Sequence, residues 1–101
     1  MEKKNNQKIE LELTPDVADG IYSNLALITH SQSEFVVDFT TVMPGVAKAR
    51  VKSRVILTPQ HAKRLMKALS DNIRRYENIF GTIEEREPIP TSFLNTPTTE
   101  A

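Results

Sequence analysis

The sequence predicts an α+β fold, in which an antiparallel meander of about four strands carries one long C-terminal helix packed on one face. Strand-like segments, either alternating or continuously apolar, recur across the first 57 residues. Short turn-forming stretches separate them, which is typical of consecutive hairpins. After Thr58 the apolar residues change to a helical period and keep it for about six turns.

The first elements are a short strand and a short helix. In residues 8–13, Ile9, Leu11 and Leu13 alternate with charged residues, the pattern of a half-buried strand. Thr14-Pro15-Asp16 then supplies an N-cap, a proline in the first turn and an acid at the positive end of the helix dipole. Gly20 ends this helix after about one turn.

Residues 21–29 are predicted to form the second strand. Its centre, residues 25–28, is apolar on both faces, whereas an exposed antiparallel strand alternates. Because a single helix covers only one face of a sheet, this pattern predicts a second covering layer, most simply another copy of the chain. Asn24 is expected to make a hydrogen bond within the sheet or at an interface.

Residues 34–43 and 47–57 are predicted as the third and fourth strands, joined at Pro44-Gly45. Matching the apolar faces favours a loop with an odd number of residues, such as 44–46. This loop sets Phe39 opposite Val51 and Asp38 opposite Lys52.

A long helix is predicted from Pro59 to about Phe80, capped by Thr58 and ended by Gly81. Its apolar residues form one continuous stripe: Ala62, Leu65, Met66, Leu69, Ile73, Tyr76 and Phe80. The chain therefore divides into a disordered arm (1–7), a single α+β domain (8–81) and a disordered, acidic, proline-containing tail (82–101).

The charges sum to zero but are segregated along the chain. Residues 46–76 hold nine basic residues and one acid, Asp71, a net charge of +8, while the segments before and after each carry −4. Such a distribution bears on binding partners and not on the fold. The candidate partner-binding residues are a strand group (Lys48, Arg50, Lys52 and Arg54) and a helix group (Lys63, Arg64, Lys67, Arg74 and Arg75).

The composition argues against an enzyme. There is no cysteine, which excludes disulfides and thiolate metal sites, and the two histidines, His30 and His61, lie in different predicted elements. The three glycines are isolated, so no phosphate-binding loop is present, and no catalytic, cofactor-binding or metal-binding residue is predicted. No apolar run approaches the ~18–20 residues of a membrane span, and no signal peptide is visible, so a cytoplasmic protein is expected.

Small size makes self-association the expected source of further burial, because about 75 residues give one core only a few kcal/mol of net stability. We therefore expect a homo-oligomer or a complex subunit. The basic block leaves two further partners open. Same-face residues recur about every 6.6–6.8 Å along a strand, close to the phosphate spacing of an extended single strand, so the strand group suits nucleic acid. It equally suits an acidic protein surface, or a solvated face that protects the sheet from aggregation.

Residues 13–76 also resemble a bacterial family of small proteins, domain of unknown function family 3467. The pieces that carry the resemblance are Tyr22-Ser23-Asn24, Ser33-Glu34-Phe35 with Asp38-Phe39, Pro44-Gly45, and Arg54-Val55-Ile56-Leu57-Thr58-Pro59 with His61-Ala62-Lys63. The family supplies no catalytic residues. Its genes often lie beside the gene for the largest RNA polymerase subunit, which implies a partner in the transcription machinery.

The leading hypothesis is thus a non-catalytic protein-interaction module, an accessory component associated with RNA polymerase. A nucleic-acid-binding protein that uses the block 46–76 is the second hypothesis. A homo-oligomeric structural protein with no other partner is the third.

Overall fold

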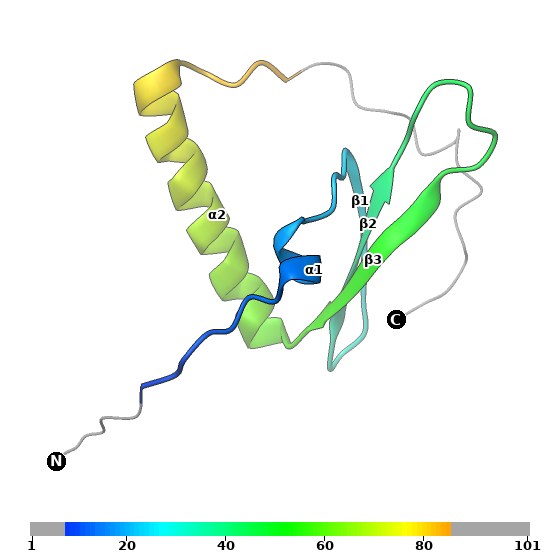
Figure 1. Cartoon of the computed structure of the whole chain (residues 1–101). Coiled ribbons are helices and arrows are strands. Elements are labelled where there is room, and N and C mark those ends of the chain that lie inside the picture. The colour runs from blue at the N-terminus through cyan, green and yellow to red at the C-terminus, as the bar shows by residue number, and fades with distance from the viewer. Residues whose placement is uncertain (1–7, 86–101) are drawn as a thin grey trace, which may run out of the picture.

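The computed structural model describes residues 8–85, and the predicted arm 1–7 and the tail from residue 86 onward lie outside the described residues. The element order is α1 (Pro15–Ala18), β1 (Leu25–His30), β2 (Phe35–Thr41), β3 (Arg50–Leu57) and α2 (Pro59–Phe80). The three strands form one antiparallel sheet in the order β1-β2-β3 (Figure 1). The α+β class is confirmed.

The predicted strand at residues 8–13 is not formed, so the sheet has three strands and not four. Ile9 and Leu11 are almost fully exposed. Alternation makes a segment suitable for a half-buried strand, but the strand exists only where a sheet edge supplies hydrogen-bond partners.

The β2–β3 register differs from the prediction. Phe39 pairs with Ser53 and Asp38 with Arg54, a displacement of two residues from the expected partners Val51 and Lys52. Next to the connecting loop, residues 42–49, the pairing is displaced by one residue, because this loop has eight residues and not the predicted odd number, and the bulge between Phe39 and Thr40 adds the second residue of displacement. A shift of two residues leaves both side chains on their predicted faces, since the side-chain period of a strand is two.

A bulge between Phe39 and Thr40 then changes the faces in the first part of β3. Beyond it Thr40 pairs with Val51 and Thr41 with Arg50. Because paired residues share a face, Val51 lies on the same face as Asp38 and not, as predicted, with Val55.

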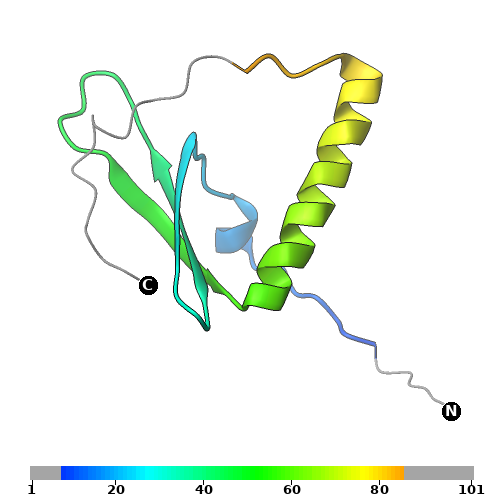
Figure 2. The same ribbon diagram turned by 180° about the vertical axis from the view of Figure 1, so that it is seen from behind.

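The two faces of the sheet are covered unequally. The face that carries Phe39, Ser53 and Val55, here called the α1 face, has α1 against it. Helix α2 begins directly after β3 and diverges from the sheet on this side, with α1 in between (Figure 1); the reverse view agrees (Figure 2). The opposite face, here called the outer face, carries Val36, Asp38 and Thr40 by alternation along β2.

The core of the described chain is small. Its buried apolar residues are Val36, Val37 and Leu57, and Asp38 and Thr40 are buried beside them. No residue of α2 is buried. The expected packing of the helix stripe across the sheet is therefore not found, and Met66, Leu69 and Tyr76 are at least half exposed to solvent.

Candidate functional site

The strand group of basic residues does not form one continuous face. Arg54 lies on the outer face opposite Asp38, whereas Arg50 lies opposite Thr41, on the α1 face. Lys52 falls at the bulge, and Lys48 precedes β3. The even spacing that favoured a nucleic-acid backbone is interrupted by the bulge, which alternation in the sequence does not reveal.

Arg54 is held by a specific partner. Its Nε donates to Asp38 Oδ1 at 2.6 Å and its Nη2 donates to Oδ2 at 2.8 Å, a two-pronged arrangement. These hydrogen bonds hold the pKa of Asp38 below its usual value and raise that of Arg54. Asp38 is only 8% exposed, so the ion pair links β2 to β3 within the sheet. Because the Asp38 carboxylate neutralises Arg54, little positive charge remains at this point for a ligand.

In the helix group, too, some basic residues are paired with an acid and others are not. Asp71 accepts a hydrogen bond from Arg74 at 3.0 Å and another from Arg75 at 3.1 Å. Lys63, Arg64 and Lys67 lie in the first half of α2, and no salt bridge to them is found within residues 8–85. The acid three and four residues before the two arginines is the sequence signal for these pairs.

The strand and helix groups are separated by the length of β3. From Arg50 to the end of the strand is about 25 Å at ~3.3 Å per residue, and α2 begins only after that. One ligand therefore meets either the start of β3 or the first half of α2, unless it is long enough to span both.

Three of the strand-group residues lie at one end of the β2–β3 hairpin together with exposed apolar side chains. We call the set Met43, Val46, Lys48, Arg50 and Lys52 the hairpin end. Met43 and Val46 are both more than half exposed. They lie in a turn that is closed by a hydrogen bond from the Val46 N–H to the Met43 carbonyl, with Gly45 at a φ of +79°. No ion pair to the three basic residues is found in the described part of the chain.

Hydrogen bonds from the segment just before β1 brace the end of β2 at this hairpin. The Asn24 side chain donates to the Val42 carbonyl and accepts from the Val42 N–H, both at 2.9 Å. Thr41 Oγ1 donates to the Tyr22 carbonyl at 2.6 Å. The predicted sheet hydrogen bond of Asn24 is thus confirmed, and it fixes the point at which the loop leaves the sheet.

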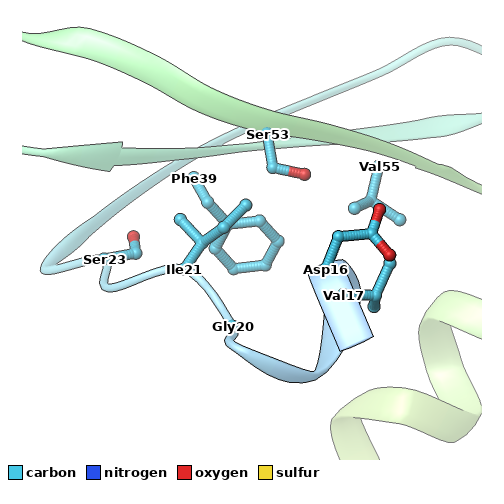
Figure 3. Close-up of a pocket in the computed structure, with 8 residues that line it drawn as sticks. All are labelled: Asp16, Val17, Gly20, Ile21, Ser23, Phe39, Ser53 and Val55. Carbon is cyan, nitrogen blue, oxygen red and sulfur yellow. The ribbon is translucent and has the colours of Figure 1, made fainter. Parts of the chain in front are cut away.

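A hollow of about 550 Å³ lies between α1 and the sheet (Figure 3). Val17 and Ile21 face Phe39 and Val55 across it, and its polar lining consists of Asp16, Ser23 and Ser53. Thr14 and the nearby backbone hold the pKa of Asp16 below its usual value, a shift in the direction opposite to the one that a general acid needs. The single hydroxyl proton of Ser23 is shared between the backbone carbonyls of Leu25 and Thr40, and no basic side chain lies beside this residue within the lining.

The lining has neither a nucleophile with its base nor a pair of carboxylates. Within residues 8–85, no three histidine, cysteine or acidic side chains converge on a point where a metal ion would sit. None of the described helices is both long enough and apolar enough to cross a membrane.

The family model described as "Protein of unknown function (DUF3467)" matches residues 1–85. The chain belongs to this family. No curated protein and no solved structure shows a significant match to the chain.

Sequence reasoning also missed the exposure of the α2 stripe in this DUF3467 protein. The spacing of the apolar residues located the stripe correctly, and they were assigned to the chain's own core. A helical period shows which residues share a face but not what covers that face.

Proposed function

We propose that the protein is a non-catalytic interaction module that docks on an acidic surface of a protein partner through the hairpin end. The observation that carries the proposal is the combination at this site of two exposed apolar residues, Met43 and Val46, with three basic residues. Apolar contacts bordered by charged groups are the usual anatomy of a protein–protein interface. The basic groups would speed and orient the encounter with an acidic partner.

A protein partner fits this arrangement better than nucleic acid. The bulge and the Asp38–Arg54 pair interrupt the basic row on β3, and the helix group lies beyond the far end of that strand. The hairpin end also offers no aromatic side chain on which a base would stack. Binding to nucleic acid would weaken steeply with salt, and this dependence separates the two cases.

RNA polymerase is the first partner to test. The support is the family's gene neighbourhood, and a large complex with acidic surface would suit the basic hairpin end. The identity of the partner is independent of the docking surface, so the two are tested by separate readouts.

The test is affinity purification of the tagged full chain from its native cells, with and without nuclease, followed by mass spectrometry. We expect a defined protein complex that survives nuclease, and loss of that complex in Arg50→Glu/Lys52→Glu. The matched control is Arg64→Glu/Lys67→Glu, which makes the same change in charge on α2. Both variants should keep the wild-type circular dichroism spectrum.

Unchanged capture by Arg50→Glu/Lys52→Glu, or loss of the complex in the helix variant alone, would overturn the docking surface. Loss of every captured protein after nuclease would instead support the nucleic-acid hypothesis.

A further inference from the structure

The apolar side of α2 is an extended exposed surface that the hairpin-end proposal does not explain. Its seven large apolar residues are between 39% and 73% exposed: Leu65, Met66, Leu69, Ile73, Tyr76, Ile79 and Phe80. Taking about 200 Å² for a fully exposed large side chain, they present roughly 800 Å². A typical monomer exposes no apolar patch beyond about 300–600 Å², so this surface is expected to be covered.

The spacing along this surface identifies the kind of cover. Ala62, Met66, Leu69, Ile73, Tyr76 and Phe80 follow one another at alternating steps of four and three residues. This mean spacing of 3.5 residues is the repeat of a helix that packs along its length against another helix. We call these six residues the seam of α2. They are flanked on one side by the row Leu65, Asn72 and Ile79, and on the other side by the row Lys63, Ser70 and Glu77.

We propose that α2 of one chain pairs in antiparallel orientation with α2 of a second copy, with the two-fold axis at the level of Asp71. In this register Ala62 faces Phe80 of the other copy, so the smallest seam residue lies opposite one of the largest. The next layer pairs Met66 with Tyr76. The layer beside the axis pairs Leu69 with Ile73, and each layer occurs twice by symmetry.

The flanking rows fit the same register. Lys63 faces Glu77 of the second copy at both ends of the seam, while Leu65 faces Ile79 on the other side. Parallel helices would place the row of Lys63 and Glu77 against the apolar row of Leu65 and Ile79. The antiparallel orientation is therefore the one that matches charge with charge and apolar residues with apolar residues.

The hydrogen bonds already present are compatible with this seam. Glu77 Oε2 accepts from the Ile83 N–H at 2.9 Å, which leaves its second carboxylate oxygen for Lys63 of the other copy. The Asn72 amide donates to the Ala68 carbonyl at 3.0 Å, so this polar residue of the otherwise apolar flanking row keeps a partner within its own helix. Asp71 and its two arginine partners lie on the side of the helix away from the seam.

The exposed area agrees with a second copy as the occupant. Roughly 800 Å² per chain equals the contribution of one partner to a standard protein interface, about 800 Å². The 22 residues of α2 extend about 33 Å, so an identical helix laid antiparallel covers the whole stripe and leaves no part over. The inference does not rest on the hairpin-end proposal, because β3 separates the two surfaces.

The deciding test exchanges the two charges of the seam. Lys63 and Glu77 lie 14 residues apart, about 21 Å along one helix, so they do not meet within a chain. We expect Lys63→Glu and Glu77→Lys each to raise the dimer dissociation constant on the order of tenfold, because each creates two like-charge contacts. The double variant Lys63→Glu/Glu77→Lys should recover the wild-type constant within about twofold.

Sedimentation equilibrium of the full chain supplies these constants. A matched pair of neighbouring substitutions gives a second readout: Leu69→Asp should raise the dissociation constant at least about 100-fold, and Ala68→Asp, directed away from the seam, should leave it nearly unchanged. Single charge reversals without effect, or a double variant without recovery, would overturn the antiparallel pairing. Equal effects of the substitutions at positions 68 and 69 would overturn the seam itself.

Discussion

The Asp38–Arg54 ion pair of the sheet gives the prediction that can be worked out most fully, for Asp38→Asn at neutral pH. Arg54 donates to both carboxylate oxygens at 2.6 and 2.8 Å. Asparagine keeps the shape but loses the charge, and its NH₂ group would face a guanidinium that also donates. A hydrogen bond to a charged group contributes about 1.5–3 kcal/mol. Because the Arg54 side chain is 46% exposed, water replaces part of it, and we expect a loss of about 1–2 kcal/mol.

The same pair predicts a pH dependence. Hydrogen bonds from Arg54 place the pKa of Asp38 in the folded protein below its usual value. The stability that this shift contributes is fully present above the unfolded-state pKa of about 3.9 and is lost as the pH falls through the lower folded-state pKa. The difference in the free energy of unfolding between wild type and Asp38→Asn should therefore disappear in acid.

Urea unfolding followed by circular dichroism measures both effects, with the protein concentration held fixed because association adds to stability. With a slope near 1 kcal/mol per molar urea, the midpoint of the variant should fall by about 1–2 M at neutral pH. Asp16→Asn is the control, because that carboxylate lies in the exposed first turn of α1 and has no arginine partner in the described chain, and the midpoint of this variant should change less. An unchanged midpoint for Asp38→Asn, or a difference in midpoint that persists undiminished in acid, would show that the Asp38–Arg54 pair does not stabilise the sheet.

Three further substitutions test single features by the same urea assay. Thr58→Ala removes the side-chain oxygen that accepts the His61 N–H at 3.1 Å and should cost about 1 kcal/mol, whereas Thr14→Ala, at a helix start without such a bond, should cost less. Thr40→Val should be neutral or slightly stabilising, since this residue is 3% exposed and its hydroxyl has no partner in the described chain; a loss above about 1 kcal/mol would show that the hydroxyl is bonded. Gly81→Ala should destabilise by about 1 kcal/mol, because φ is +99° at the end of α2, and an unchanged midpoint would contradict that geometry.

Local signals in the sequence predicted the local structure well. The Thr58 cap, the proline after it and Gly81 delimit α2 as the structure has it, with Gly81 at positive φ. Helix α1 likewise starts at the predicted Thr14-Pro15-Asp16, although the Thr14 side chain makes no capping hydrogen bond. These features depend on neighbouring residues, so a single sequence contains the information.

Features that depend on distant partners were predicted less well. Ile9, Leu11 and Leu13 have the alternation of a strand but no neighbour in the sheet. The bulge at Phe39 and Thr40 changed the face of Arg50, which no alternation pattern shows. Alternation along the strands still predicted correctly that Asp38 faces a basic residue of β3, although that residue is Arg54 and not Lys52.

The most informative difference concerns the stripe of α2. The same apolar spacing serves a helix that covers its own sheet and a helix that pairs with another chain. The doubly apolar centre of β1 had already predicted a further covering layer, and in the structure Ile28 remains well exposed. Both observations agree with a chain that completes its core by association.

The most direct test of this account is the mass of the wild-type full chain by sedimentation equilibrium over a range of micromolar concentrations. A dimer should give twice the chain mass of 11.4 kDa, with dissociation on dilution accompanied by loss of secondary structure. A single-chain mass at every concentration, together with cooperative unfolding, would show that the chain covers its apolar surface without a second copy and would contradict the account.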